Sequence, residues 1–292
     1  MKSLAKLLAL TISAAAVLTA SLPASGATPP GQDARYALVC SSGAPFQAIL
    51  NDVLVAHSDG KEEAPPQVTI NFWLRSGKNT LRLLVPEGAT TNPGKPAYCK
   101  ILVSQFSDAG TPHGKKAGRI LTSVALPAGG ATGRTPPDKT VSFSLTAKAA
   151  PACKLWEAAK PITLDSQAKE EILGLVGEYR TALQAQNLER MVALDEFRSK
   201  ESYLCTGRSI EEYQASGKEI TRILLAALGG AKFAPWDPSQ ARIQLEAGGL
   251  VASVTVNGQP PITATRKEGG PNAQYTSNAY IAKIGDKWTL VR

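Results

Sequence analysis

The sequence predicts two domains: an all-β antiparallel sandwich, followed by an α+β domain in which a curved antiparallel sheet wraps a long helix. Three observations support this prediction. Residues 36–148 contain about seven short apolar runs, separated by loops rich in Gly, Pro and Thr, without helical periodicity. Residues 164–228 show helical periodicity and helix-capping residues, and the chain after Ala241 alternates like strands again. At 292 residues, the chain is long enough to bury two cores.

The first 27 residues have the features of a secretory signal peptide. Lys2 and Lys6 form a positive start, an apolar run follows over 7–20, and small residues at 25–27 offer a cleavage site. The apolar run is too short and too alanine-rich for a membrane-spanning helix, which needs about 20 strongly apolar residues. We therefore expect a periplasmic or secreted protein without a membrane span.

The net charge argues against a nucleic-acid partner. The formal charge is +8, and it falls to +6 without the predicted signal peptide, which carries two lysines and no acidic residue. Beyond Lys115 and Lys116 the basic residues are scattered, whereas nucleic-acid binders concentrate them on one face. We expect neither nucleic-acid binding nor a cofactor.

Four cysteines remain after signal-peptide removal, which indicates disulfide bonds in an oxidising compartment. Three pairings are open from the sequence. We favour Cys40–Cys99 together with Cys153–Cys205, because each bridge then stays within one predicted domain. A metal site is not expected, since the cysteines lack C-x-x-C spacing and the two histidines are isolated.

The predicted sandwich covers residues 36–148 and begins with strands at 36–40 and 46–50. Asn51 and Asp52 are typical of a tight turn into the next strand. Further strands are expected at 68–74, 81–85, 97–106, 119–125 and 140–147. The segment 149–163, which contains two prolines and little periodicity, is predicted to be a linker.

The most regular predicted hairpin lies at 68–85. Val68, Ile70, Phe72 and Leu74 alternate along its first strand, and Gly77 supplies the positive φ angle of the turn. This hairpin resembles one found in galactose-binding-like and related β-sandwich modules. Trp73 should then face away from the apolar side, where it could stack on a sugar ring; a partly buried aromatic residue is the alternative.

Helices are predicted to follow the linker. Asp165 and Ser166 are suited to cap a long helix, and Gln186 and Asn187 interrupt the pattern before a short second helix. Residues 203–207 are expected to be irregular or a strand. Ser209 and Glu212 then form a capping box for a third helix, whose apolar residues are Ile220, Ile223, Leu224, Ala227 and Leu228.

The chain from Ala241 is predicted to form four or five antiparallel strands, at 241–247, 250–256, 262–267, 275–284 and 287–291. Gly285 and Asp286 form the turn of the last hairpin. Together with the helix corner at 182–191, the final hairpin with Trp288 resembles the nuclear-transport-factor-2-like (SnoaL-like) domains. The resemblance covers about residues 164–292, and it implies a cone whose open end is a pocket, a dimer face or packed core.

Candidate catalytic residues follow from this resemblance, because enzymes of the family place Asp, His or a Tyr-Asp pair inside the cone. No histidine follows His113, so only carboxylates and tyrosines remain. The candidates are Asp195, Tyr203 and Tyr179, with Tyr213 and Tyr275 also noted. For Asp195 a solvated helix-end carboxylate is the competing interpretation, and for Tyr179 it is core packing.

The sequence therefore favours an exported, non-catalytic binding or protein-interaction protein of a bacterial-type cell envelope, such as an immunity or accessory protein. One alternative is an envelope glycan binder, using Trp73 with Trp236 as a second ligand-binding candidate. The other is an isomerase- or dehydratase-like enzyme in the cone pocket. The expected partner is another exported protein or a glycan, and a homodimer could form through the cone sheet.

Overall fold

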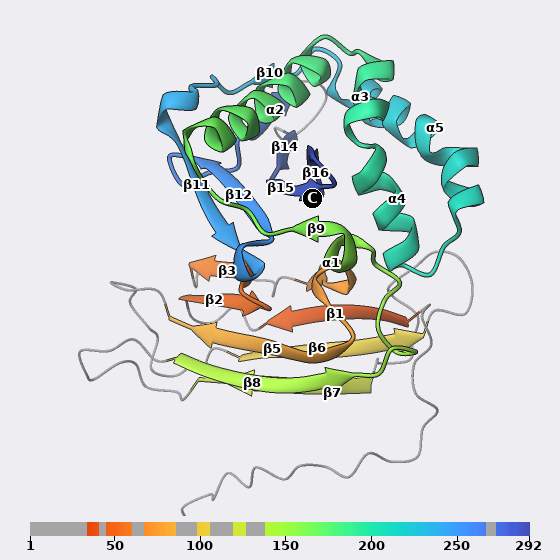
Figure 1. The fold of residues 1–292 in the computed structure, drawn as a ribbon, viewed down its shortest axis with the longest axis vertical. Helices are drawn as coiled ribbons and strands as arrows, with labels where there is room; N and C mark the ends of the chain where they lie inside the picture. The colour runs from red at the N-terminus through yellow and green to blue at the C-terminus, as the bar shows by residue number, and fades with distance from the viewer. Residues whose placement is uncertain are drawn as a thin grey trace, which may run out of the picture.

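The computed structural model describes residues 34–40, 45–59, 67–85, 98–105, 119–126, 138–266 and 273–292. The predicted signal peptide and parts of several loops lie outside these residues. In Figure 1 the strands β1–β8 occupy the lower half, and helices α2–α5 occupy the upper half together with the later strands. The described part thus combines antiparallel sheets with five helices, which confirms the mixed fold class at this level.

Two four-stranded antiparallel sheets make up the lower half. Their strand orders are β4-β1-β6-β7 and β3-β2-β5-β8. The strands are β1 (Ala34–Cys40), β2 (Pro45–Leu50), β3 (Val53–Asp59), β4 (Gln67–Thr69), β5 (Gly77–Leu84), β6 (Tyr98–Gln105), β7 (Arg119–Ala125) and β8 (Asp138–Leu145). Alternate residues of β2 and β5 are buried, as expected for sheets that cover a core on one face.

The predicted turn between β2 and β3 is confirmed. Leu50 pairs with Val53, and both turn residues have positive φ angles, 51° at Asn51 and 65° at Asp52. Asn and Asp tolerate this left-handed conformation better than other non-glycine residues. The Asn51 side chain also donates to the Trp73 carbonyl at 2.7 Å, so the turn fixes a neighbouring segment.

The predicted hairpin at 68–85 is wrong. Strand β4 stops at Thr69, and a 3-10 helix, η1 (Asn71–Trp73), replaces the rest of the expected strand. The cause is tertiary: the Asn71 side chain accepts a hydrogen bond from the Tyr36 amide and donates one to the Cys205 carbonyl, each at 2.7 Å. These bonds hold the backbone in a turn, and β5 pairs with β2 and β8 instead of β4.

Residues 149–163, predicted to be a linker, contain two short elements. Helix α1 (Leu155–Ala158) is followed by β9 (Ala159–Lys160), which pairs with β15. In Figure 1, α1 and β9 lie where the lower and upper halves meet. The segment is thus part of the packed structure, and Leu155 is fully buried.

The helix corner follows the sequence prediction closely. Helix α2 (Ser166–Gln184) is capped by Asp165, whose side chain accepts from the Ala168 amide at 2.8 Å. A residue with positive φ, Gln186, ends the helix region. Asn187 then caps α3 (Leu188–Leu194).

The next two helices differ from the prediction in part. Residues 203–207, expected to be irregular or a strand, belong mostly to α4 (Glu196–Cys205). The capping box of α5 (Ile210–Leu228) is present as predicted. Its buried face, however, carries Thr221 and Leu225, whereas Ile220 and Ile223 are 51% and 61% exposed. Both isoleucines, named above only as apolar residues of this helix, therefore lie on its exposed side.

The last strands form two sheets. One has the order β11-β12-β15-β16, with β9 paired to β15; the other has the order β10-β13-β14. Their bounds are β10 (Lys232–Phe233), β11 (Ala241–Glu246), β12 (Val251–Val256), β13 (Ile262–Arg266), β14 (Ala273–Ser277), β15 (Ala279–Ile284) and β16 (Lys287–Leu290). The predicted single strand 275–284 therefore breaks at Asn278, and its two pieces join different sheets. The β15–β16 hairpin at Gly285 is as predicted, with φ 62° at the glycine.

Two clusters of buried side chains form the core. The second contains Val176 and Tyr179 of α2 against strands of both carboxyl-terminal sheets. The first fills the sandwich but continues into the later part of the chain. Beside sandwich residues such as Leu38 it contains Ala282 and Val291. The lower and upper halves therefore share a core.

Cys153 and Cys205 form a disulfide, with their Cα atoms 4.6 Å apart, as the favoured pairing has it. Cys40 is also disulfide-bonded, and Cys99 lies opposite it in the β1–β6 register.

No helix within the described ranges is long and apolar enough to cross a membrane.

Candidate functional site: a pocket between the two halves

A pocket of ≈ 550 Å³ lies between the sandwich and the carboxyl-terminal part of the chain. Its size is within the range of small-molecule sites. Three groups of residues line it: Leu54, Val55, Val68, Phe72 and Trp73 from the sandwich, Arg198, Ser199 and Ser202 from α4, and Tyr275, Thr276, Ser277, Asn278, Tyr280 and Arg292 from the end of the chain. One wall is therefore apolar, and the facing walls carry hydroxyl groups and two guanidinium groups.

The apolar wall is positioned by the unexpected 3-10 helix. Because η1 turns the backbone away from the strand direction, Phe72 stays half-buried at the pocket while Trp73 packs inward at 6% exposure. The Trp73 ring makes an edge contact with Tyr280, with centroids 5.1 Å apart, and lies 6.3 Å from the Trp156 ring. The ring therefore does not face outward, and the alternative interpretation of Trp73 as a mostly buried aromatic residue fits the structure.

Arg292 is the most unusual charged group of the pocket. Its guanidinium carbon lies 3.7 Å from the Phe72 ring centroid and 5.8 Å from that of Trp73, in cation–π geometry. Its Nε is buried and has no hydrogen-bond partner within the described residues, and its Nη2 only approaches the Cys205 sulfur at 3.8 Å. Burial lowers the pKa of this guanidinium, while the Glu201 charge acts in the opposite direction. Such a guanidinium has unused donors.

Arg198 is paired on one side. Its Nη2 donates to Asp195 at 2.7 Å and to the Tyr179 hydroxyl at 2.5 Å, and the guanidinium lies 5.0 Å from the Tyr179 ring centroid. The Arg198 side chain is 20% exposed, whereas that of Asp195 is 7% exposed. Among the described residues the hydrogen bonds of Arg198 run through Nη2, and the residue also lines the pocket.

The Asp195 and Tyr179 groups are deeply buried behind Arg198. Burial raises the pKa of Asp195, and it raises the pKa of Tyr179 further still. Arg198 opposes both shifts through its charge and hydrogen bonds. The interpretation of Asp195 as a solvated helix-end carboxylate is wrong, because the side chain is buried and forms an ion pair with Arg198, three residues later in the chain.

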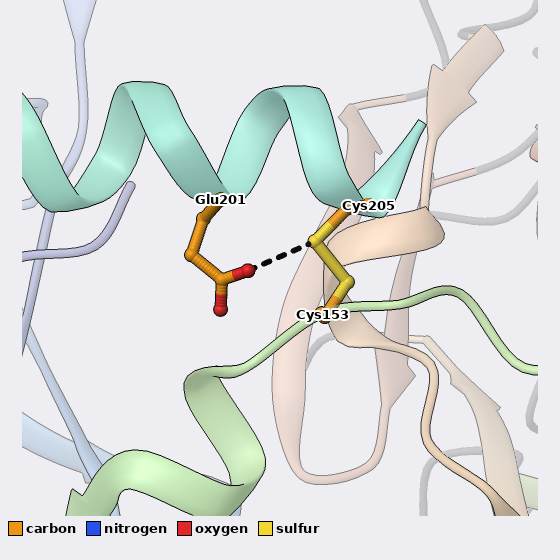
Figure 2. Close-up of side chains that lie close together, drawn as sticks. All are labelled: Cys153, Glu201 and Cys205. Atoms are coloured by element: carbon orange, nitrogen blue, oxygen red, sulfur yellow. Dashed lines mark hydrogen bonds between the residues drawn. A yellow bond between two sulfur atoms is a disulfide. The ribbon is translucent and has the colours of Figure 1, made fainter. Parts of the chain in front are cut away.

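A buried carboxylate, Glu201, lies beside the Cys153–Cys205 disulfide (Figure 2). Glu201 accepts hydrogen bonds from the backbone amides of Lys154 and Leu155, and it thereby caps helix α1. Burial raises the pKa of Glu201, and the two amides and the charge of Arg292 oppose that shift. Glu201 thus ties the segment before the long helix to α4.

Cys153, Glu201 and Cys205 are close enough together to suggest a metal site. The Cys205 sulfur lies 3.4 Å from Glu201 Oε2 (Figure 2). Both sulfurs, however, are bonded to each other, so neither is the thiolate that a metal requires. The arrangement fits a structural disulfide and does not fit a metal centre.

The remaining predicted site residues are dispersed. The Tyr203 hydroxyl pairs with Ser216 at 2.7 Å, and its ring packs against Tyr213 and Arg208, so Tyr203 does not converge with Asp195. Trp236 is half-buried against the second core cluster and does not line this pocket. Of the three catalytic candidates, the structure brings together only Asp195 and Tyr179.

Sequence reasoning missed both arginines of the pocket. Arg198 carried a usable signal, because it follows Asp195 at the i,i+3 spacing of helical ion pairs. Arg292 carried no such signal in the sequence, because its role in the pocket comes from packing against Phe72, which is far away in the chain. The polar residues at 276–278 were hidden inside a predicted continuous strand.

Comparison with known proteins adds no information about this site, so its geometry is the only guide to its function. No known protein family, curated protein or solved structure matches the chain. The resemblances to nuclear-transport-factor-2-like domains and to β-sandwich modules therefore stay predictions from the sequence.

Proposed function

We propose that this chain is an exported, non-catalytic binding protein of the cell envelope, and that the pocket between its two halves is the binding site. The observation that carries the proposal is the composition of the pocket lining. Within the described part of the chain it combines apolar side chains, hydroxyl groups, Arg198 and Arg292 with no carboxylate side chain and no imidazole. Such a lining can hold a ligand but offers no general base of ordinary pKa.

The enzyme alternative is less well supported. Asp195 would be its general base, yet its carboxylate is held by Arg198 and does not line the pocket. Tyr179 shares the same guanidinium, and burial raises its pKa, so it holds its proton at neutral pH. Groups fixed in this way position Arg198 and have no access to a substrate in the pocket.

A protein-interaction role is the second candidate, and one observation favours it. Ile220 and Ile223 lie one helical turn apart on α5 and are both mostly exposed. Exposed apolar neighbours on a helix are typical of contact surfaces. The glycan alternative stays open, because Trp73 lines the pocket, although only 6% of the residue is exposed.

We further propose that the chain is organised as a sandwich at 36–148 and a cone-like domain at 164–292. Hydrogen-bonded strand pairing supports this division, because the described strands β1–β8 pair only among themselves. The second core cluster contains only residues from Ile162 onward. The shared first cluster means that the two parts should unfold as one cooperative unit.

Protein released from the periplasm by osmotic shock and studied by native mass spectrometry tests the function. The expected result is a polypeptide lacking the first 27 residues that carries a small molecule and releases it chemically unchanged. Ser202→Trp should abolish this binding because it fills the pocket, whereas Ser142→Trp on the exposed face of β8 should retain it. Retention by both variants, or chemical conversion of the bound molecule, would contradict the proposal.

A further inference from the structure

We propose that the pocket binds a small carboxylate with a compact apolar body, whose anionic group is held by Arg292 and Arg198 and whose body lies against the sandwich wall. This inference rests on the proposed binding function and names the chemical class of the ligand. It follows from the donors left unused in the pocket, from the distribution of polar and apolar lining, and from the size of the cavity.

The first step concerns the hydrogen-bonding capacity of Arg292. A guanidinium has five N–H donors and is seldom buried without an acceptor. Within the described residues Arg292 has no ion pair, and its Nε has no acceptor. Its nearest charge, Glu201, already accepts from two backbone amides. The unused donors of a guanidinium match the two oxygens of a carboxylate, which accepts them in a bidentate arrangement.

The second step concerns the charge that such a ligand would meet. Arg198 reaches the pocket from α4, and Asp195 and Tyr179 hold it from behind through Nη2. This contact fixes its orientation without using its other donors. Two arginine side chains therefore line one pocket whose described lining has no carboxylate side chain to repel an anion. A carboxylate offers two charged oxygens and forms stronger hydrogen bonds with a guanidinium than a neutral carbonyl does, and that favours the anion.

The third step concerns the rest of the ligand. Leu54, Val55 and Phe72 contribute apolar lining, with Phe72 directly beside Arg292, and the cavity of ≈ 550 Å³ exceeds what a carboxylate alone would fill. A purely polar anion such as phosphate would leave this wall in contact with water. A sugar acid would need an open aromatic face for stacking, but only 6% of Trp73 is exposed. An aliphatic or aromatic body fits the wall best.

Isothermal titration of the full-length mature protein with matched probes tests the inference. Phenylacetate supplies both parts of the predicted ligand, phenylacetamide lacks the charge, and acetate lacks the apolar body. We expect saturable binding of phenylacetate, at least tenfold weaker binding of the amide and of acetate, and weakening of phenylacetate binding as the salt concentration rises. Equal binding of the amide, or saturation by acetate alone, would overturn the inference.

Variants locate the site. Arg292→Met should weaken phenylacetate binding at least tenfold, and Arg292→Lys should restore only part of it because lysine keeps the charge without the planar fork. Arg222→Met, on the exposed face of α5, is the matched control and should bind like the parent. Far-ultraviolet circular dichroism checks that each variant is folded. If Arg292→Met fails to fold, the comparison of phenylacetate with its amide on the parent protein still decides the question.

The outcomes separate this inference from the proposed function. If the protein retains a neutral small molecule but ignores all three probes, the binding function stands and the carboxylate inference falls. If phenylacetate binds and is recovered altered, the non-catalytic function falls while the ligand class stands. If Arg292→Met binds phenylacetate as tightly as Arg222→Met does, the anion does not contact Arg292 and the assignment of the site is overturned.

Discussion

Removing the Cys153–Cys205 disulfide should destabilise the protein by about 4 kcal/mol. The bridge spans 52 residues, from the segment before α1 to the end of α4. In the chain-entropy description, a loop of this length lowers the entropy of the unfolded chain by about 14 cal/mol/K, which corresponds to about 4 kcal/mol at 25 °C. For a chain of this size, 1 kcal/mol shifts the melting temperature by about 2–4 °C.

The assay is thermal and urea unfolding of the double variant Cys153→Ala with Cys205→Ala. We expect a melting temperature about 8–16 °C lower than that of the parent, which follows from the 4 kcal/mol. The urea midpoint should fall while the urea dependence stays equal or rises slightly, because the unfolded chain becomes more expanded. Labelling before reduction should find no reactive thiol in the variant, since Cys40 is also disulfide-bonded.

A shift below about 3 °C would refute this reasoning. A shift of that size is no larger than the one expected when a chain of this size loses a single ordinary buried contact. It would mean that Glu201, Asn71 and the shared core already restrict the end of α4 in the absence of the bridge. A matched reference is Ser142→Ala on the exposed face of β8, which should melt within about 1 °C of the parent.

Three further predictions concern the contacts between the two halves. Asn71→Leu should lower stability by about 2–4 kcal/mol, because the Tyr36 amide and the Cys205 carbonyl lose their partners, and urea unfolding measures the loss. Tyr280→Phe removes the hydroxyl that donates to the Leu54 carbonyl at 3.2 Å and should cost about 1 kcal/mol in the same assay; no change would place that bond among the negligible ones. Glu246→Gln should raise the melting temperature more at pH 8 than at pH 4. Burial raises the Glu246 pKa in the folded state, so the stability contributed by its proton is complete below the unfolded pKa of about 4.3 and is lost as the pH rises through the folded pKa. An offset that does not vary between pH 4 and pH 8 would contradict this assignment.

Elements with local causes could be predicted from the sequence. Asp165 and Asn187 cap their helices through bonds to amides only three residues away, and the capping box at Ser209 is equally local. The turns at Asn51 and Gly285 follow from the φ angles that their residues allow. These features depend on neighbours in the chain, which the sequence shows directly.

The features that were missed depend on distant partners. The alternation at 68–74 is a regular strand pattern, but Asn71 is bound by Tyr36 and Cys205, and those contacts outweigh the local preference. Likewise, a helical stripe cannot show that Ile220 and Ile223 of α5 are on the uncovered side, because the choice of face depends on where α3 and α4 pack. The pocket likewise joins residues that lie far apart in the chain, such as Phe72, Arg198 and Arg292, and so the sequence showed only part of it.

The core shared by the two halves has a consequence for how the chain would reach its final structure if it is exported as proposed. Val291 packs in the same buried cluster as Leu38, and the Tyr280 hydroxyl bonds a residue 226 positions earlier in the chain. If the chain crosses a membrane from its amino terminus, the sandwich emerges while a side of its core still lacks these late residues. Its apolar surface then stays exposed until translocation is almost complete. Folding should therefore be slow and dominated by long-range contacts, and nascent chains released before residue 280 should be preferred targets for envelope chaperones and proteases.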